Sequence, residues 1–100
     1  MLYDHFTPYV LMQLEAFGFC GGGEAKDFIR DGRIELGGAL PINTHGGQLG
    51  EAYIHGMNGI AEAVRQIRGT SVNPVANVEH VLVTAGTGVP TSGLILGVDP

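Results

Sequence analysis

Residues 43–59 hold the side chains of this chain that are best suited to chemistry. The stretch contains five glycines and two histidines, His45 and His55, around a single tyrosine, Tyr53. Imidazole and phenol groups transfer protons in many enzymes. Glycines let the backbone come close to another group. The stretch therefore predicts a proton-transfer site at the entrance to the apolar-periodic segment that follows it.

Two glycine-rich places could contact a ligand: the first could hold an anion or a thioester oxygen, and the second could let the backbone approach a ligand. In the first, the Asn43 side chain lies near the backbone amides of Gly46 and Gly47, and such donors stabilise developing negative charge. In the second, Gly86 and Gly88 flank one residue in a predicted turn. The competing interpretations are a helix-packing loop with a buried tyrosine and an ordinary hairpin turn.

Two further places near the start of the chain carry reactive side chains. Cys20 precedes three glycines and a predicted helix start, where a thiol can become nucleophilic. We favour a buried small residue at a helix corner, because no histidine lies nearby in sequence. Residues 3–6, Tyr-Asp-His-Phe, could serve a site or form a solvated end. No histidine or cysteine spacing indicates a zinc site, so no metal is expected.

The composition indicates one small domain, part of whose apolar outer surface is covered by other protein. The chain has 100 residues, of which 44% are hydrophobic and only 15% charged, and its mean hydropathy is +0.19. We expect part of this apolar surface to face other protein. The net charge of −5 disfavours nucleic acid as a partner, since such proteins carry a basic surface.

Cysteine content and hydropathy suggest where the protein works. The single cysteine excludes an internal disulfide and favours a reducing compartment. No apolar run approaches the ~18 residues that a membrane-spanning helix needs, and the N-terminus lacks the features of a signal peptide. The expected location is the cytoplasm.

Apolar periodicity predicts three helices and a closing hairpin. The first helix starts at Pro8 with Thr7 as N-cap and ends at Gly18, and the second covers residues 23–30. Residues 33–50 are expected to be loop. The third helix starts at Ala52 or Gly56 and runs to Arg68, with Gly69 as its cap. Its expected core residues are Met57, Ile60, Ala63, Val64 and Ile67.

The predicted hairpin pairs a strand over 78–84 with a strand over 91–98, joined by a glycine turn over 85–90. The second strand is almost continuously apolar, which predicts a central position in a sheet. One hairpin is too small a sheet to be stable by itself. We therefore expect an α/β chain that is the end of a larger unit and incomplete at 100 residues.

Several motifs, taken in order, resemble the C-terminal domain of thiolases, and most closely the sterol-carrier-protein-type, lipid-transfer-protein branch. They are Asp4-His5-Phe6-Thr7, residues 14–20 (LEAFGFC), Gly23-Glu24-Ala25, residues 38–43 (GALPIN) and Gly46-Gly47. The resemblance covers nearly the whole chain and implies two similar α/β halves in a five-layer αβαβα fold, usually dimeric. Residues 1–100 would be most of the second half, with the N-terminal half absent.

The same resemblance carries expectations about ligands. It implies a coenzyme A thioester as substrate, with no tightly bound cofactor, and a homodimer as the assembly. Cys20 matches a family position that is not the catalytic cysteine. The acyl-accepting cysteine of thiolases would belong to the absent half.

Three departures from the thiolase pattern concern the catalytic groups. Tyr53 stands where thiolases have a catalytic histidine, and Tyr3 stands where relatives have Asn or His. The turn after Thr84 lacks the usual cysteine. Two tyrosines at these positions resemble the thiolase-fold steroid side-chain aldolases, which cleave β-hydroxyacyl-CoA thioesters and work with a small partner protein bearing an OB-fold domain.

Retro-aldol chemistry agrees with these residue types. It needs a base for the β-hydroxyl group and an acid to protonate the enolate, and it needs no acyl-enzyme. A phenol can donate or accept a proton, with an ordinary pKa near ~10. We therefore predict Tyr3 and Tyr53 as the acid/base pair, His55 as a residue that orients them, and the turn at Gly86 and Gly88 as a thioester contact.

Three alternatives remain open at this point. The protein could be a true thiolase or acetyl-CoA acetyltransferase in which His55 replaces the displaced histidine. It could be a non-catalytic subunit that binds acyl-CoA or lipid. The 100 residues could also be a fragment that is no functional unit.

Overall fold

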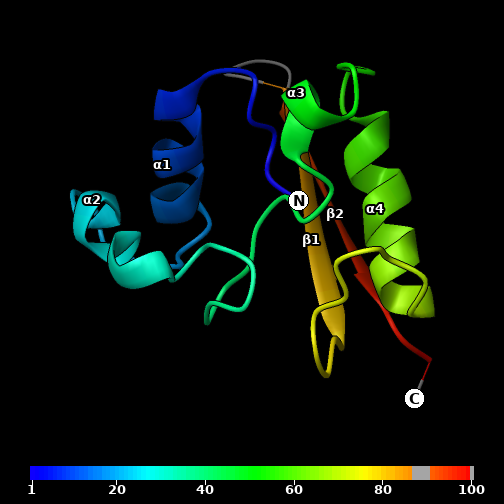
Figure 1. The fold of residues 1–100 in the computed structure, drawn as a ribbon. Helices are drawn as coiled ribbons and strands as arrows, with labels where there is room; N and C mark the ends of the chain where they lie inside the picture. The colour runs from blue at the N-terminus through cyan, green and yellow to red at the C-terminus, as the bar shows by residue number, and fades with distance from the viewer. Residues whose placement is uncertain (87–90, 100) are drawn as a thin grey trace.

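The hairpin stands between two groups of helices in the computed structural model, which describes residues 1–86 and 91–99 (Figure 1). α1 and α2 lie on one side of it and α4 on the other. The elements in chain order are α1 (Thr7–Ala16), α2 (Ala25–Phe28), a 3-10 turn (Arg30–Gly32), α3 (Gly47–Gly50), α4 (Met57–Arg68), β1 (His80–Gly86) and β2 (Thr91–Gly97).

The first helix begins one residue earlier than predicted. Its N-cap is Phe6, and Thr7 is already helical, so the prediction of Thr7 as N-cap is wrong. Pro8 lies in the first turn, where the missing N–H costs nothing. Gly18 ends the helix as predicted: it has a φ of 79°, and the N–H of Phe19 reaches back to the Leu14 carbonyl at 3.0 Å.

The region from residue 23 to 50 differs more from the prediction. The helix expected over 23–30 is reduced to the four residues of α2, after Gly23 with a φ of 78°, and a 3-10 turn in which Asp31 takes a φ of 59°. The loop expected over 33–50 contains the short helix α3. Four residues carry too little periodic signal for a helix prediction.

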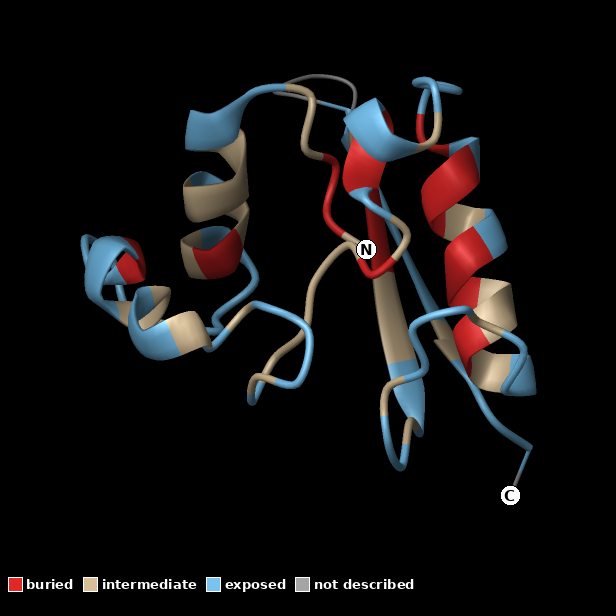
Figure 2. Ribbon diagram, viewed as in Figure 1, coloured by how far each residue is buried: buried red, intermediate tan, exposed pale blue. Residues whose placement is uncertain are grey.

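Of the two predicted starts of the third helix (α4), Ala52 and Gly56, the structure confirms Gly56, and it also confirms the predicted end at Arg68. Gly56 is its N-cap and Gly69, with a φ of 69°, its C-cap. Its buried face is not the predicted apolar stripe. Met57 is 59% exposed, and Ile60 and Val64 are only half-buried. The residues that the helix buries are Asn58, Gly59, Glu62, Ala63 and Gln66 (Figure 2).

This polar face is buried because Glu62 has partners for its charge. The carboxylate accepts hydrogen bonds from Thr44 Oγ1 at 2.8 Å, from Gln66 Nε2 at 3.1 Å and from Ser71 Oγ at 2.5 Å. Arg65 donates to its second oxygen at 3.2 Å. A buried charge is tolerated only with such partners, and these join α4 to the loops before and after it.

The hairpin is confirmed as an antiparallel pair of β1 and β2, with His80 opposite Gly97 and Gly86 opposite Thr91. β1 starts two residues later than predicted and includes Ala85 and Gly86, which were assigned to the turn. The rest of that turn, residues 87–90, lies outside the described residues. β2 is not central within the part of the chain that the structure describes, because it pairs with β1 alone. Most of its residues are exposed.

The first residues of the chain run along the other edge of β1. The Met1 nitrogen donates to the Leu82 carbonyl at 2.6 Å, and the Thr84 N–H donates to the Met1 carbonyl at 2.9 Å. This is how neighbouring parallel strands are linked. Leu2 packs beyond this point with Leu14 and Ala25 in the apolar core. The next residue, Tyr3, therefore lies at the end of a strand-like segment.

The buried carboxylate of Glu62 makes stability depend on pH. Burial alone would raise its pKa, but hydrogen bonds from Ser71, Thr44, Arg65 and Gln66 outweigh burial, so the pKa of Glu62 lies below its ordinary value. A lowered folded-state pKa stabilises the fold above the ordinary Glu pKa of about 4.3. That stabilisation is lost as pH falls through the folded value.

We predict that Glu62→Gln lowers the unfolding free energy at pH 7 by about 1–3 kcal/mol, because four donors lose a charged acceptor. It should also flatten the dependence of the thermal midpoint on pH below about 4.3, where the unaltered protein loses this stabilisation. The matched control is Glu79→Gln, at an exposed position, which should change neither. Equal effects of both substitutions would show that the Glu62 contacts do not stabilise the fold.

Candidate active site

Two tyrosine hydroxyl groups meet in this structure. Tyr3 and Tyr53 are 50 residues apart in sequence, and their hydroxyl oxygens lie 2.8 Å apart, within hydrogen-bond distance. Tyr3 is 8% exposed and Tyr53 is 44% exposed. One tyrosine of the pair is therefore almost wholly buried as a residue, and the other has a side chain that a ligand can reach.

A tight loop between α3 and α4 presents Tyr53. Ala52, Tyr53 and His55 all have φ values between 47° and 61°, a region that costs an L-residue roughly 1–2 kcal/mol. The Tyr53 N–H donates to the Gln48 carbonyl at 2.8 Å, which ties the loop to α3. Strained backbone of this kind persists where the surroundings enforce it, and it gathers at functional sites.

Gly56 completes the loop at a position where a larger residue would be strained and tightly packed. It has a φ of 89°, and a Cβ atom there would lie 3.3 Å from Ala85 Cβ on β1 and 3.8 Å from the Tyr3 ring. The close approach brings the Tyr53 loop against the strand that also carries the Tyr3 segment.

Histidines pack against both tyrosine rings. The His55 ring meets the Tyr53 ring edge-on, with centroids 5.1 Å apart and planes at 75°. His5 stacks on Tyr3 at 4.5 Å. His45 instead contacts α4, where its Nε2 lies 3.2 Å from Asn58 Nδ2, and burial lowers its pKa. Of the two histidines in residues 43–59, His55 is the one that lies against the tyrosine pair.

The contact between the two phenols changes the acidity of Tyr3. The hydrogen bond with Tyr53, followed by burial, raises the pKa of Tyr3 to about 12. Both effects favour the neutral phenol over the phenolate. Tyr3 therefore keeps its proton at neutral pH and is available as a hydrogen-bond donor.

Two of the groups expected to hold an anion have hydrogen-bond partners within the protein. The Asn43 side chain bonds both backbone groups of Leu2, accepting at 2.8 Å and donating at 3.0 Å. The Gly46 N–H donates to the Asn43 carbonyl. Asp4 accepts from the N–H of Gln48 at 3.0 Å, beside Gly47. The Asn43 side chain and the Gly46 N–H therefore have hydrogen-bond partners within the chain, and the binding of a thioester by these groups stays a prediction.

Two other predicted positions lie apart from this contact. Gly86 ends β1 with a φ of 84°, while Gly88 lies outside the described residues. The thiol of Cys20 is half-buried against the core. Burial and the carboxylates of Glu15 and Glu24 raise its pKa. A raised pKa opposes the thiolate that a nucleophile needs, in agreement with the structural role favoured for Cys20.

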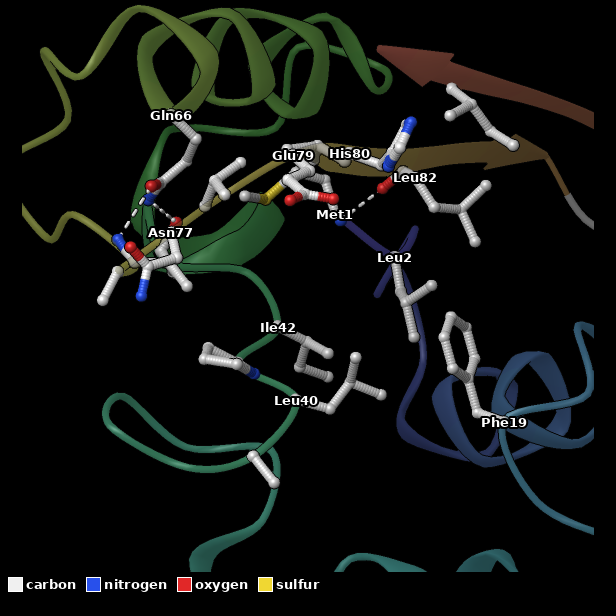
Figure 3. Close-up of a pocket in the computed structure, with 18 of the residues that line it drawn as sticks. Met1, Leu2, Phe19, Leu40, Ile42, Gln66, Asn77, Glu79, His80 and Leu82 are labelled. Carbon is white, nitrogen blue, oxygen red and sulfur yellow. Dashed lines mark hydrogen bonds between the residues drawn. The ribbon is translucent and has the colours of Figure 1, made fainter. Parts of the chain in front are cut away.

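An apolar groove of 540 Å³ lies away from the tyrosine pair (Figure 3). Leu2, Phe19, Leu40, Ile42 and Leu82 are among its lining residues. A smaller hollow of 140 Å³ lies beside the pair, between His55, Gly56 and Met57 on one side and the hairpin on the other. The groove is the larger of these two spaces, but His55 lines the hollow, and the tyrosines adjoin its lining residues.

No cluster of three or more metal-binding side chains occurs in residues 1–86 and 91–99. Within the same residues, no helix is both long and apolar enough to cross a membrane.

Residues 1–97 match the family of thiolase C-terminal domain-like proteins. The chain belongs to this family. The resemblance drawn from the sequence motifs is thereby confirmed, as is the assignment of the fold to the C-terminal part of a thiolase.

Curated relatives of this thiolase-like chain include two enzymes of steroid breakdown. The chain is 86% identical over 97 residues to the 17-hydroxy-3-oxo-4-pregnene-20-carboxyl-CoA lyase of Mycobacterium tuberculosis. It is 78% identical over 99 residues to the steroid side-chain-cleaving aldolase of Thermomonospora curvata. These matches cover 97% and 99% of the chain and 25% of each relative. The chain thus spans about a quarter of their length.

A more distant relative and a solved structure complete the comparison. The chain is 37% identical to the benzoylsuccinyl-CoA thiolase subunit BbsB of Thauera aromatica over 85% of its length and 24% of that protein. The solved Ltp2-ChsH2(DUF35) aldolase is 78% identical, with a TM-score of 0.93, and the match covers 98% of this chain and 26% of that one.

The two hydroxyl groups can be tested by titration. We predict that Tyr3 titrates near pH 12 and that Tyr53→Phe lowers its pKa toward the ordinary value near ~10, because the largest cause of the shift is removed. Tyrosine-ring carbon chemical shifts of the full-length protein that carries this chain, followed against pH, measure this. The control is Tyr9→Phe, which leaves the pair intact. An unchanged Tyr3 pKa in Tyr53→Phe would show that the hydroxyls do not meet.

The close approach of Asp4 to Gly47 gives a second prediction. A Cβ at Gly47 would lie 2.0 Å from Asp4 Oδ2, so Gly47→Ala must displace the carboxylate. Gly37 has a similarly positive φ of 82° with open space around it, so Gly37→Ala should cost only about 1–2 kcal/mol of backbone strain. Gly47→Ala should cost about 1–3 kcal/mol more. Equal losses in thermal unfolding would contradict this packing.

Proposed function

We propose that the protein carrying this chain is a thiolase-fold lyase that cleaves a carbon–carbon bond in a β-hydroxyacyl-CoA by a retro-aldol reaction. The observation that carries the proposal is the 2.8 Å contact between the hydroxyl groups of Tyr3 and Tyr53. Thiolase chemistry uses an acyl-carrying cysteine, whereas this site offers two linked proton-transfer groups.

The reaction balances with one proton moved. The β-hydroxyl group loses its proton as the bond between the α- and β-carbons breaks. The β-carbon becomes a ketone, and the bonding electrons pass into the enolate of the thioester. Protonation of the α-carbon then releases a shorter acyl-CoA. The proton transfers are concerted: one tyrosine accepts the β-hydroxyl proton as it passes its own proton to the other tyrosine, which gives its proton to the α-carbon, so both tyrosines stay neutral.

The hydrogen bond between the tyrosines lets this happen without a free phenolate. The raised pKa of Tyr3 keeps the phenol neutral, and a proton can pass between two oxygens that are already in contact. His55 orients the Tyr53 ring through its edge-on contact. The strained loop pre-organises Tyr53, because its side chain does not have to be ordered during the reaction.

The names of the relatives support this substrate class. In a 17-hydroxy steroid with a coenzyme A thioester on carbon 20, the hydroxyl lies β to the thioester carbonyl, as retro-aldol cleavage requires. Identity of 86% to the lyase with that name favours a steroid side chain as the substrate. The thioester is a substrate, and we propose no tightly bound cofactor.

We also propose the assembly in which the site works. It includes the N-terminal thiolase half, a second copy of the protein and a small partner with an OB-fold domain. The name of the solved Ltp2-ChsH2(DUF35) aldolase supports a second component. The free, half-buried Cys20 agrees with a reducing cytoplasm as the place of action.

We predict that Tyr53→Phe and Tyr3→Phe each lower kcat for C–C cleavage by at least about 10²-fold, the size typical of acid–base groups. Binding of the coenzyme A ester should stay within about twofold of the starting protein, because neither hydroxyl is assigned to the thioester. Both are measured with the full-length protein and a β-hydroxyacyl-CoA.

The matched control is Tyr9→Phe, which removes the hydroxyl of the third tyrosine in the chain and should leave kcat unchanged. Full activity of Tyr53→Phe would overturn the proposal. Binding with no turnover by the unaltered protein would favour a non-catalytic subunit.

A further inference from the structure

The side chain of Gln13, on α1, holds both backbone groups of Tyr3. Its Nε2 donates to the Tyr3 carbonyl at 2.9 Å and to the Tyr9 carbonyl at 3.0 Å. Its Oε1 accepts from the Tyr3 N–H at 3.3 Å. One amide side chain thus contacts the peptide groups on both sides of the Tyr3 Cα, which limits how that residue can rotate.

Thr84, on β1, closes the arrangement. Its hydroxyl oxygen accepts from the Tyr3 N–H at 2.9 Å, and the hydroxyl donates to Gln13 Oε1. The Thr84 side chain is 6% exposed, so water competes little for these bonds. Tyr3, Thr84 and Gln13 form a closed ring of hydrogen bonds that joins the first residues, α1 and β1.

We infer that Gln13 and Thr84 are positioning residues, which hold the Tyr3 backbone so that its hydroxyl meets Tyr53. The inference rests on the proposed function, because it gives these residues a purpose in that reaction. Neither contacts the reacting atoms in this account. A reacting group displaced by about 1 Å can lose about 10²-fold in rate, so a clamp on the backbone can matter as much as the hydroxyl that it places.

The inference is tested in the full-length protein with Thr84→Val, which keeps the shape and removes the hydroxyl, and with Gln13→Met, which keeps the length and removes the amide. Each should lower kcat about 10- to 100-fold, while KM stays within about twofold. Thr84→Ser retains the hydroxyl and should rescue kcat. Val10→Ala, elsewhere on α1 in a half-buried core position, should lower the thermal midpoint and leave kcat unchanged.

A double-mutant cycle separates positioning from general loss of structure. In a Tyr3→Phe background, Thr84→Val should have no further effect on the residual rate, because the hydroxyl that it positions is gone. An unchanged kcat in Thr84→Val, or a full additional loss in the Tyr3→Phe background, would overturn the inference. Full activity of Tyr3→Phe itself would instead contradict the proposed function. Failure of the positioning role and failure of the proposed function therefore give different results.

Discussion

The segment from Met1 to Tyr3 is the part of the chain on which the site depends. Its backbone is bonded to β1 through Leu82 and Thr84, and Asn43 bonds both peptide groups of Leu2. Each of these contacts links residues more than 40 positions apart in the sequence. They fix where the strand-like segment ends, and the first side chain beyond that end is the enclosed tyrosine of the pair.

The second tyrosine is placed by packing on the other side of the hairpin. α4 lies against β1, and its buried Glu62 bonds the loops before and after the helix. That anchorage holds the middle of α4, and Gly56 brings the preceding loop to within contact of Ala85 and Tyr3. A buried polar network that is fully bonded is rigid, and a rigid frame can keep a strained loop in one conformation.

The reactive side chains were predicted from the sequence better than the residues that hold them in place. Tyr3, Tyr53 and His55 were identified by residue type and by the departure from the thiolase pattern, and the structure brings them together. The Asn43 side chain and the Gly46 N–H, which were predicted to bind substrate, have hydrogen-bond partners within the chain. Local spacing does not reveal these contacts. The buried polar face of α4 was missed because a search for helical periodicity considers apolar residues only. Gln13 and Thr84 carry no motif, and their role depends on tertiary contacts.

The central claim is that the tyrosine pair moves a proton and that no acyl group is transferred to the protein. Mass spectrometry of a reaction in heavy water, with the full-length protein and a β-hydroxyacyl-CoA, tests it most directly. The account predicts a ketone and a shorter acyl-CoA that carries one deuterium on its α-carbon, with no free coenzyme A consumed and the protein mass unchanged. A covalent acyl-protein, or products that form only when free coenzyme A is added, would contradict it.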